Sequence, residues 1–329
     1  MNESAESTGT TPRTKTPTAS PAAAAAATTP PGRAEQVGDH SWAYVQQPGT
    51  WFINNAGFVA GDSPGDGGAV LIDTCATNRR TRALLDTATG LVGPLRAAVS
   101  THHHGDHTYG NHLLPAGLPI WASAPAVAEA QATGIQHYQG VFQQPDWGDQ
   151  QLRLATDVVE PAGSTVGRVL ARAFGATAHT RGDVVGWVPD DGVLYTGDLV
   201  FAGVIPLALS GSVRGWLEAL EWLRGFAAAV VVPGHGPVSH TPNTAIDAMA
   251  GYLGLVLRVA EDALARGRSA VDAAADLASG PYADWGDRDE RNLINLTVAM
   301  AELRGEPVDV AALLAAALAN NGGPLPCLA

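Results

Sequence analysis

Four side chains that commonly bind metal ions fall within six residues of this chain, and they limit the possible folds more than any other feature. The segment 101–107 reads THHHGDH and directly follows a predicted strand, residues 96–100. In α/β sheets, ligands gather at the carboxyl ends of strands. His102 and His104 alternate along the backbone and can point the same way, whereas Asp106 and His107 belong to the start of the next helix. The segment therefore predicts two neighbouring metal positions.

Three further ligand candidates, each at the end of a predicted strand, follow later in the chain. They are His179, Asp198 and His235. Imidazole and carboxylate ligands without a thiolate suit zinc, and also manganese or iron. His103 breaks the alternation of the first segment, so we expect it to point away and to support the structure around the site.

Short β-rich runs, punctuated by glycine and proline, alternate with helical patterns through the first two thirds of the chain. The predicted strands are residues 43–47, 51–60, 69–72, 96–100, 168–174, 184–188, 193–195 and 229–232, with a helix over 78–91. Two sheets with helices outside them predict an α/β fold in the form of a four-layer αββα sandwich.

Composition divides the chain into three regions. Residues 1–36 are rich in Thr, Ser, Pro and Ala and cannot bury enough apolar surface to offset the entropy of ordering, so we expect a disordered tail. Residues 37–242 contain the strands and the ligands. Residues 243–329 form a predicted helical extension, because apolar residues recur at spacings of three and four and three further helices are indicated at 270–277, 290–303 and 308–318.

Together the ligand positions resemble the signature of the metallo-β-lactamase superfamily, which reads His, any residue, His, any residue, Asp, His. His102, His104, Asp106 and His107 match it, and the later single His, Asp and His of the family match His179, Asp198 and His235 in the same order. The resemblance covers roughly residues 42–240.

The resemblance implies two sets of metal ligands. One set is His102, His104 and His179, and the other is Asp106, His107 and His235. Asp198 would bridge the two metals, most simply two zinc ions, with manganese or iron as the other options. A hydroxide shared by the metals would attack a carbonyl carbon, and Asp106 would orient it and pass its proton to the leaving group. Asp73 would hydrogen-bond a ligand imidazole.

Aromatic residues near the ligands predict a pocket for a small-molecule substrate. Tyr138, Phe142 and Trp147 lie among polar residues before the second set of strands and are placed as a lid over an apolar substrate. Phe201 follows Asp198, where acyl-homoserine lactonases usually have a tyrosine, and this weakens the lactonase interpretation.

The bridging Asp198 argues against a true β-lactamase, since lactam-hydrolysing members generally lack it. The motif of residues 108–111 agrees with the hydrolases related to glyoxalase. We therefore expect hydrolysis of an ester, thioester, lactone or amide. The alternatives are an iron-dependent persulfide dioxygenase, a biosynthetic cyclase or lyase with the same metals, and a noncatalytic binding protein.

Charge and composition argue against several partners and compartments. With 19 basic and 32 acidic residues the formal net charge is −13. A negative charge repels the phosphate backbone, so nucleic acid is not expected as a partner. The sequence has no apolar run long enough for a membrane span, no signal-peptide core, and only Cys75 and Cys327, so we expect a cytoplasmic protein. The segment 284–288 and the helix after it either close the pocket or form a homo-oligomer contact, and the sequence leaves both open.

Overall fold

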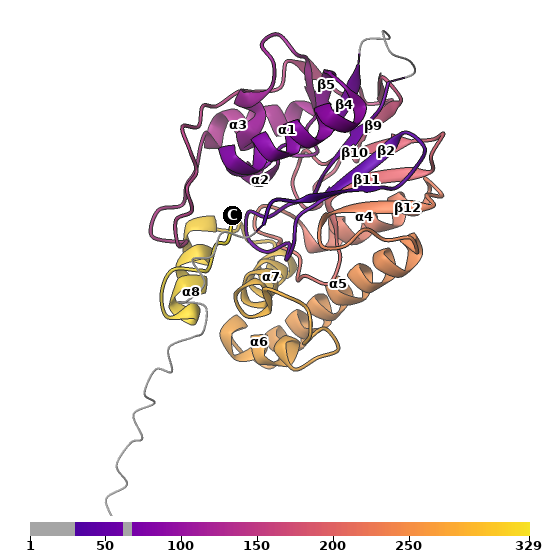
Figure 1. Cartoon of the computed structure of the whole chain (residues 1–329). Helices are drawn as coiled ribbons and strands as arrows, with labels where there is room; N and C mark the ends of the chain where they lie inside the picture. The colour runs from indigo at the N-terminus through magenta and orange to yellow at the C-terminus, as the bar shows by residue number, and fades with distance from the viewer. Residues whose placement is uncertain (1–29, 62–67) are drawn as a thin grey trace, which may run out of the picture.

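Two β-sheets packed against each other form the centre of the fold (Figure 1). This computed structural model describes residues 30–61 and 68–329. Among these residues, the larger sheet has the order β1-β2-β3-β4-β5-β6-β7. Its strands are, in chain order, Arg33–Gln36, Ser41–Val45, Ala56–Val59, Ala69–Ile72, Leu95–Val99, Ile120–Ala122 and Asp157–Val158. The other sheet has the order β12-β11-β10-β9-β8, and β8 to β12 are Ser164–Val166, Val169–Ala173, Val184–Val188, Val193–Phe201 and Val230–His235.

Strands pair in parallel where the ligand candidates lie. In the larger sheet β4 to β7 are parallel, and in the second sheet β11 pairs in parallel with β12, while the remaining pairs are antiparallel. Parallel strands carry their carboxyl ends to the same edge of a sheet. The segments after β4 and β5 and the carboxyl halves of β11 and β12 therefore meet there.

Alternating side chains along the strands build the layers. Val70 and Ile72 of β4 point into the apolar layer between the sheets, whereas Leu71 between them packs outward with Leu84 of the first helix. This is the period-two pattern of a strand that is buried on both faces. Leu194 of β11 likewise packs outward, into the cluster that contains the helices of the second sheet. The predicted four-layer αββα sandwich is thus confirmed.

Helices cover both outer faces, as Figure 1 shows, with α1 and α3 over the larger sheet and α4 and α5 against the second. The helices are α1 (Asn78–Val92), α2 (Gly105–Thr108), a 3-10 turn (Tyr109–Leu113), α3 (Ala124–Thr133), α4 (Val213–Arg224), α5 (Pro242–Ala265), α6 (Ala270–Ala278), α7 (Arg288–Arg304) and α8 (Val310–Asn321). The C-terminal helices share one hydrophobic cluster with α4 and β11. They are therefore packed against the body of the fold through an apolar core.

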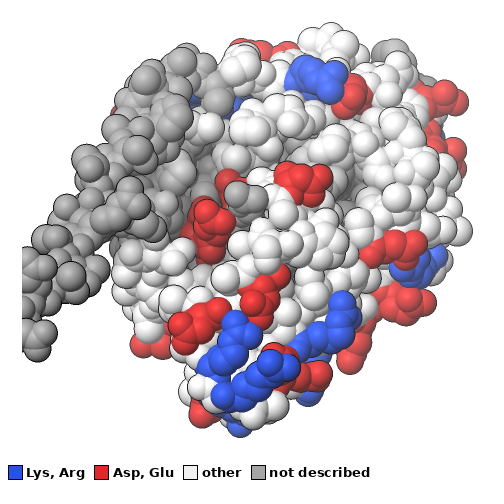
Figure 2. All heavy atoms as spheres, turned by 90° about the horizontal axis from the view of Figure 1, so that it is seen from below, with Lys and Arg blue, Asp and Glu red and all other residues white. Residues whose placement is uncertain are grey.

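The face seen from below carries both signs of charge. On the portion of that face not drawn in grey, Arg side chains lie among Asp and Glu side chains (Figure 2). Arg268, for example, donates from Nη1 to an Asp276 oxygen 2.7 Å away, and Arg266 lies 2.8 Å from Asp262. Such exposed pairs contribute little to stability.

The start of the fold differs from the sequence prediction. Strand β1, Arg33–Gln36, lies in the segment predicted as a disordered tail and pairs antiparallel with β2. Main-chain hydrogen bonds hold this edge strand, and its polar composition gives no sign of them. The rest of the predicted tail, residues 1–29, lies outside the described residues.

A second difference lies in residues 51–60, for which the sequence pattern predicts one strand. Only Ala56–Val59 pairs as β3, because the chain turns at Thr50, whose carbonyl accepts from Ile53 N at 3.0 Å, and Phe52 adopts a positive φ of 60°. The sequence pattern does not predict strands β6, β7 and β8 or helix α3, and the strands are too short to show a pattern. None of the helices in the described residues has the length and apolar character needed to cross a membrane.

Candidate metal centre

The histidine segment folds as its spacing predicts. After β5 ends at Val99 the chain turns, and His104 in an extended conformation caps the amino end of the short helix α2. Asp106 and His107 sit on that helix, so their side chains leave the backbone in a different direction from those of His102 and His104. The local conformation therefore separates two ligand groups within six residues.

Two groups of ligand atoms converge at the edge of the sheets. His102, His104, His179 and Asp198 offer one atom each, all within 4.8 Å of one another, and Asp106, His107 and His235 form a second such group. In the first group His179 Nε2 lies 2.9 Å from His104 Nδ1, and in the second His235 Nε2 lies 3.3 Å from Asp106 Oδ2. The structure thus brings together all seven residues that the sequence nominated.

Asp198 lies between the groups. Its Oδ2 is 3.3 Å from His179 Nε2 and 3.4 Å from His235 Nε2, and its Oδ1 is 3.1 Å from His107 Nε2. The carboxylate contacts imidazoles of both groups, which is the placement that a bridging ligand requires.

Glycines allow the backbone to carry Asp198 into this position. Gly197 has a φ of 49°, and a Cβ on it would lie 2.4 Å from Thr101 Oγ1. A Cβ on Gly234 of the neighbouring strand would lie 1.9 Å from Asp198 Oδ1. Only glycine fits such a close approach of backbone to side chain.

Buried polar atoms without hydrogen-bond partners mark the centre of the cluster. Nε2 of His102 is buried and has no hydrogen-bond partner among the described residues. Nε2 of His107 and Oδ1 of Asp198 are also buried, and although they lie 3.1 Å apart, neither makes a hydrogen bond of good geometry. Buried polar atoms are normally satisfied. Imidazoles and carboxylates without a thiolate are donors that suit zinc, manganese or iron. The residues present therefore fit two divalent metal ions.

Outer contacts fix the ring orientation of three imidazoles. His107 Nδ1 lies 2.8 Å from Asp73 Oδ2, His102 Nδ1 lies 3.1 Å from Thr101 Oγ1, and His235 Nδ1 lies 3.0 Å from the Gly49 carbonyl. Thr101 in turn donates from N and Oγ1 to the two oxygens of Asp73, both at 2.7 Å. In each ring the other nitrogen, Nε2, faces the cluster, which is how partners of metal-binding histidines act.

Burial sets the protonation of the first group. It lowers the pKa of His102 and His104 well below the ordinary range, and lowers the pKa of His179 to about 4, partly opposed by the charge of Asp198. These imidazoles are neutral near pH 7. The neutral imidazole is the form that binds a metal ion.

In the second group, neighbouring carboxylates determine the pKa values of the histidines. Burial alone would lower the pKa of His235, but Asp198 and Asp106 raise it to about 9, and Asp198 and Asp73 likewise raise the pKa of His107. Burial disfavours the charge of Asp198, yet His235 and His107 hold the pKa of that carboxyl well below its usual value. A metal ion would have to displace the protons on these two imidazoles, so we expect metal affinity to rise with pH.

His103 lies outside the cluster. Its Nδ1 is 3.0 Å from Glu129 Oε2 on α3, so the ring ties the ligand segment to that helix instead of joining the ligands. The buried Cys75 is a free thiol whose sulfur accepts from Gln46 Nε2. Neither residue belongs to a candidate metal group.

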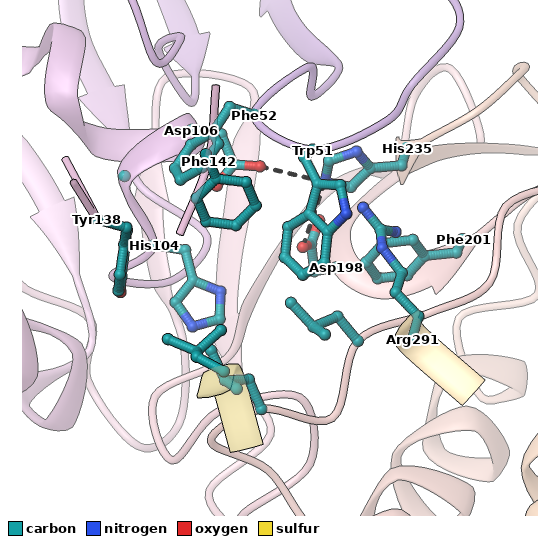
Figure 3. A pocket seen from close by; sticks show the side chains of 14 residues that line it. Trp51, Phe52, His104, Asp106, Tyr138, Phe142, Asp198, Phe201, His235 and Arg291 are labelled. Atoms are coloured by element: carbon teal, nitrogen blue, oxygen red, sulfur yellow. Dashed lines mark ion pairs between the residues drawn. The ribbon is translucent and has the colours of Figure 1, made fainter. Parts of the chain in front are cut away.

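A pocket of about 570 Å³, counting the solvent at its mouth, opens onto the cluster (Figure 3). Its floor is formed by His104, Gly105, Asp106, Asp198 and His235, and its walls by Trp51, Phe52, Tyr138, Phe142, Phe201, Leu207, Leu209, Arg291 and Leu314. The walls come from separated stretches of sequence, including the helices α7 and α8.

The predicted pocket residues are brought together except for one. Tyr138, Phe142 and Phe201 line the pocket, whereas Trp147 does not. The Trp147 ring stacks on His137 at 4.8 Å and its Nε1 donates to Gln144, so it packs behind Phe52, with a ring separation of 5.1 Å. Trp147 supports the wall instead of lining it.

Sequence reasoning misses several wall residues. The sequence pattern places Trp51 and Phe52 in a strand, although a positive φ at Phe52 turns that segment toward the pocket. It places Arg291 in the helix after segment 284–288, for which closing the pocket is one of the two options left open, and Leu314 in a helix that is given no role. The short apolar run from Leu207 to Leu209 is the one sequence signal for a wall at this position. It does not indicate that these residues lie near the metal ligands.

Comparison with known proteins adds a family and a fold. The sequence profile described as the metallo-beta-lactamase superfamily matches residues 49–235. Curated relatives named hydroxyacylglutathione hydrolase include one from Synechococcus sp. (strain JA-3-3Ab), 33% identical over 153 residues, and one from Methylococcus capsulatus, 29% identical over 171 residues. These alignments cover 45% and 51% of this chain and 52% and 57% of the relatives. The chain thus spans about half the length of the curated relatives it matches.

Solved structures share the fold. DIM-1 metallo-beta-lactamase superposes with a TM-score of 0.54 at 19% identity, covering 69% of this chain and 98% of that one. A double mutant of the sec-alkyl sulfatase PisA1 superposes with a TM-score of 0.64 at 16% identity, covering 83% of this chain and 50% of that one. At such low identity these similarities concern the fold alone.

Proposed function

Because this chain belongs to the metallo-beta-lactamase superfamily, we propose that it is a metal-dependent hydrolase that cleaves an ester, thioester, lactone or amide bond of a small molecule. The observation that carries this proposal is the Asp198 carboxylate, which contacts imidazoles of both ligand groups at the floor of an apolar pocket. The hydrolase name of the curated relatives supports it.

Each ligand group has a place in this proposal. One divalent ion would be held by His102, His104 and His179, and a second by Asp106, His107 and His235. Asp198 would bind both ions. Zinc suits these donors best, with manganese or iron as alternatives. Two bound divalent ions would supply Lewis acidity toward a carbonyl oxygen and toward water.

Asp106 is the candidate general base. It lines the pocket, and its side chain is 12% exposed against 4% for Asp198, so it is the more accessible of the two carboxylates at the floor. Burial disfavours its charge, but His107 and His235 lower its pKa, so the group is ionised at neutral pH. A carboxylate in this position can take a proton from the attacking water and return it to the leaving atom.

The pocket walls contribute by keeping out water. Phe52, Phe142 and Phe201 surround the floor with aromatic surface, and an acyl group seated among them displaces solvent from the reacting centre. The chemistry of the floor and the selection by the walls are thus separate contributions of this chain.

Metal content and turnover measured on one preparation test the proposal. We expect about two zinc or manganese ions per chain by plasma mass spectrometry, and chelator-sensitive hydrolysis of a panel of chromogenic esters, thioesters and lactones. His104→Ala should lower both metal content and kcat/KM, the latter by about 100-fold. His240→Ala, an exposed histidine outside the cluster, is the control. One iron per chain with oxygen uptake and no hydrolysis would contradict the proposal and favour the dioxygenase alternative.

A further inference from the structure

The walls of the pocket are apolar apart from one side chain. Among the described residues that line it, Arg291 is the only one outside the floor that carries a charge; the others are Trp51, Phe52, Tyr138, Phe142, Phe201, Leu207, Leu209 and Leu314. Arg291 is 2% exposed, and Figure 3 shows its guanidinium beside Trp51, on the side of the pocket where His235 and Phe201 lie. A cation in such a wall is costly unless it interacts with an acceptor.

The contacts of Arg291 leave some of its hydrogen-bonding capacity unused. Nη1 donates to the Ile205 carbonyl at 2.8 Å, and Nη2 lies 2.9 Å from Asp287 Oδ2. The guanidinium also stacks over the Trp51 ring, with its carbon 4.5 Å from the ring centroid. Nε is buried and has no hydrogen-bond partner among the described residues. Because an unsatisfied buried donor destabilises the protein, an acceptor that reached this guanidinium would bind favourably.

The surroundings hold this side chain rigidly. Trp51, on which the guanidinium stacks, donates from Nε1 to Glu290 Oε1 at 2.8 Å, so two neighbouring residues of α7 both contact the same indole. A guanidinium held in place presents its donors in a fixed plane, which matches the two oxygens of a carboxylate. The site is therefore preorganised for a planar anion.

We propose that Arg291 is a specificity-determining residue that binds the carboxylate of an otherwise apolar acyl substrate. This inference rests on the proposed hydrolase function and deepens it by naming the substrate class. The aromatic walls would seat the apolar portion of the acyl group, and the floor would face the scissile carbonyl. A glutathione thioester, by contrast, would place a peptide with several charges against apolar walls.

A pair of rigid substrates tests the proposal. The para-nitrophenyl esters of para-carboxybenzoic acid and of para-carbamoylbenzoic acid have similar shapes and differ in one negative charge. We expect the metal-loaded enzyme to favour the carboxylate in kcat/KM by about tenfold, the size of one charge-assisted hydrogen bond. Arg291→Gln should bring this ratio to about one, and Arg291→Lys should preserve some of it.

Controls separate recognition from a structural role. Arg304→Gln removes a half-exposed guanidinium from the other end of α7 and should leave the ratio as in the wild type. If Arg291→Gln lowers kcat/KM for both esters equally, Arg291 only clamps Trp51 and the Ile205 loop, and the proposal fails. It also fails if the wild type shows no preference, or if the preference survives in Arg291→Gln because the carboxylate binds at the floor.

A binding measurement keeps this test independent of turnover. The unreactive ketones para-acetylbenzoate and para-acetylbenzamide are titrated against the same metal-loaded protein, with tryptophan fluorescence as the signal. We expect the wild type to bind the carboxylate about tenfold more tightly and Arg291→Gln to lose that difference. If no ester is hydrolysed, the proposed function fails, while this titration still decides the role of Arg291. Equal affinities in the wild type would overturn it.

Discussion

The floor and the walls of the pocket are built in different ways. At the floor and directly behind it, the ligand atoms of each group lie within 4.8 Å of one another, and Asp73 and Thr101 fix the rings of His107 and His102. The walls consist of aromatic and aliphatic side chains from distant segments, held by packing, with Arg291 as the exception. The difference teaches that the metal-ligand cluster and the pocket walls are encoded separately in the sequence. Changes at the floor should affect metal binding and all substrates, whereas changes at the walls should affect one substrate against another.

The largest effect is expected from Asp198→Asn, which removes the charge facing both ligand groups. We expect kcat/KM to fall by about 1000-fold for every substrate, since stabilisation by both metal positions depends on this carboxylate. Plasma mass spectrometry should show fewer than two metal ions per chain. Asp190→Asn, a mostly exposed carboxylate on the surface, is the matched control. If the variant kept its activity and bound two metal ions, metal binding and turnover would not depend on Asp198.

A smaller effect on metal affinity should follow from Asp73→Asn. Asp73 Oδ2 lies 2.8 Å from His107 Nδ1. An amide at this position is uncharged, so the imidazole of His107 loses the negative charge that holds its ring in orientation. We expect metal affinity to fall by about 10- to 100-fold, measured by competition with a chromogenic chelator. The far-ultraviolet circular dichroism spectrum should be retained. An unaltered affinity would show that Asp73 serves the fold and not the floor.

Leu314→Ala sharpens the comparison from the side of the walls. Leu314 lies on α8 and lines the pocket far from the ligands in sequence. Removing its side-chain bulk should lower kcat/KM for a large aryl ester by about tenfold and for an acetyl ester by less, because only the large acyl group reaches it. Metal content should stay at two ions. Leu91→Ala, at an exposed leucine, is the control, and an equal loss for both esters would contradict the assignment.

The smallest effect concerns stability and pH at Asp183, a buried acid outside the ligand groups. Burial raises the pKa of its carboxyl from 3.8 to about 7, although Thr180 donates to it from N at 2.9 Å. Between these values the folded protein holds a proton that the unfolded chain has lost, so stability decreases as pH rises through this window. Asp183→Asn should flatten that slope by an amount on the order of 1 kcal/mol in chemical denaturation. A slope identical to the wild type would show that the folded-state pKa is not raised.

Much of the fold could be predicted from sequence because the strongest patterns are local. The strands at Ala69–Ile72 and Val184–Val188 and the helix at Asn78–Val92 follow from periodicity and flanking residues. The short strands β1 and β6 to β8 could not be found, since main-chain pairing with a neighbour forms them and their side chains show no pattern. The division of the chain between body and helical extension stays a prediction.

The sequence by itself determined which residues gather at the floor. His102, His104, Asp106 and His107 lie in one short segment after a strand. The single ligands follow a strand, as His179 does, or lie in the carboxyl half of one, as Asp198 and His235 do. Beyond Tyr138, Phe142 and Phe201, only the tertiary structure decided the walls. Trp51 and Glu290 are 239 residues apart and joined by one hydrogen bond, and Arg291 reaches the pocket because α7 packs against the loop that carries Trp51. The positions of the metal ligands depend on the local backbone conformation of a few residues, which a short sequence motif can specify. The walls depend on how whole helices pack against distant loops, and no short-range sequence pattern predicts that packing.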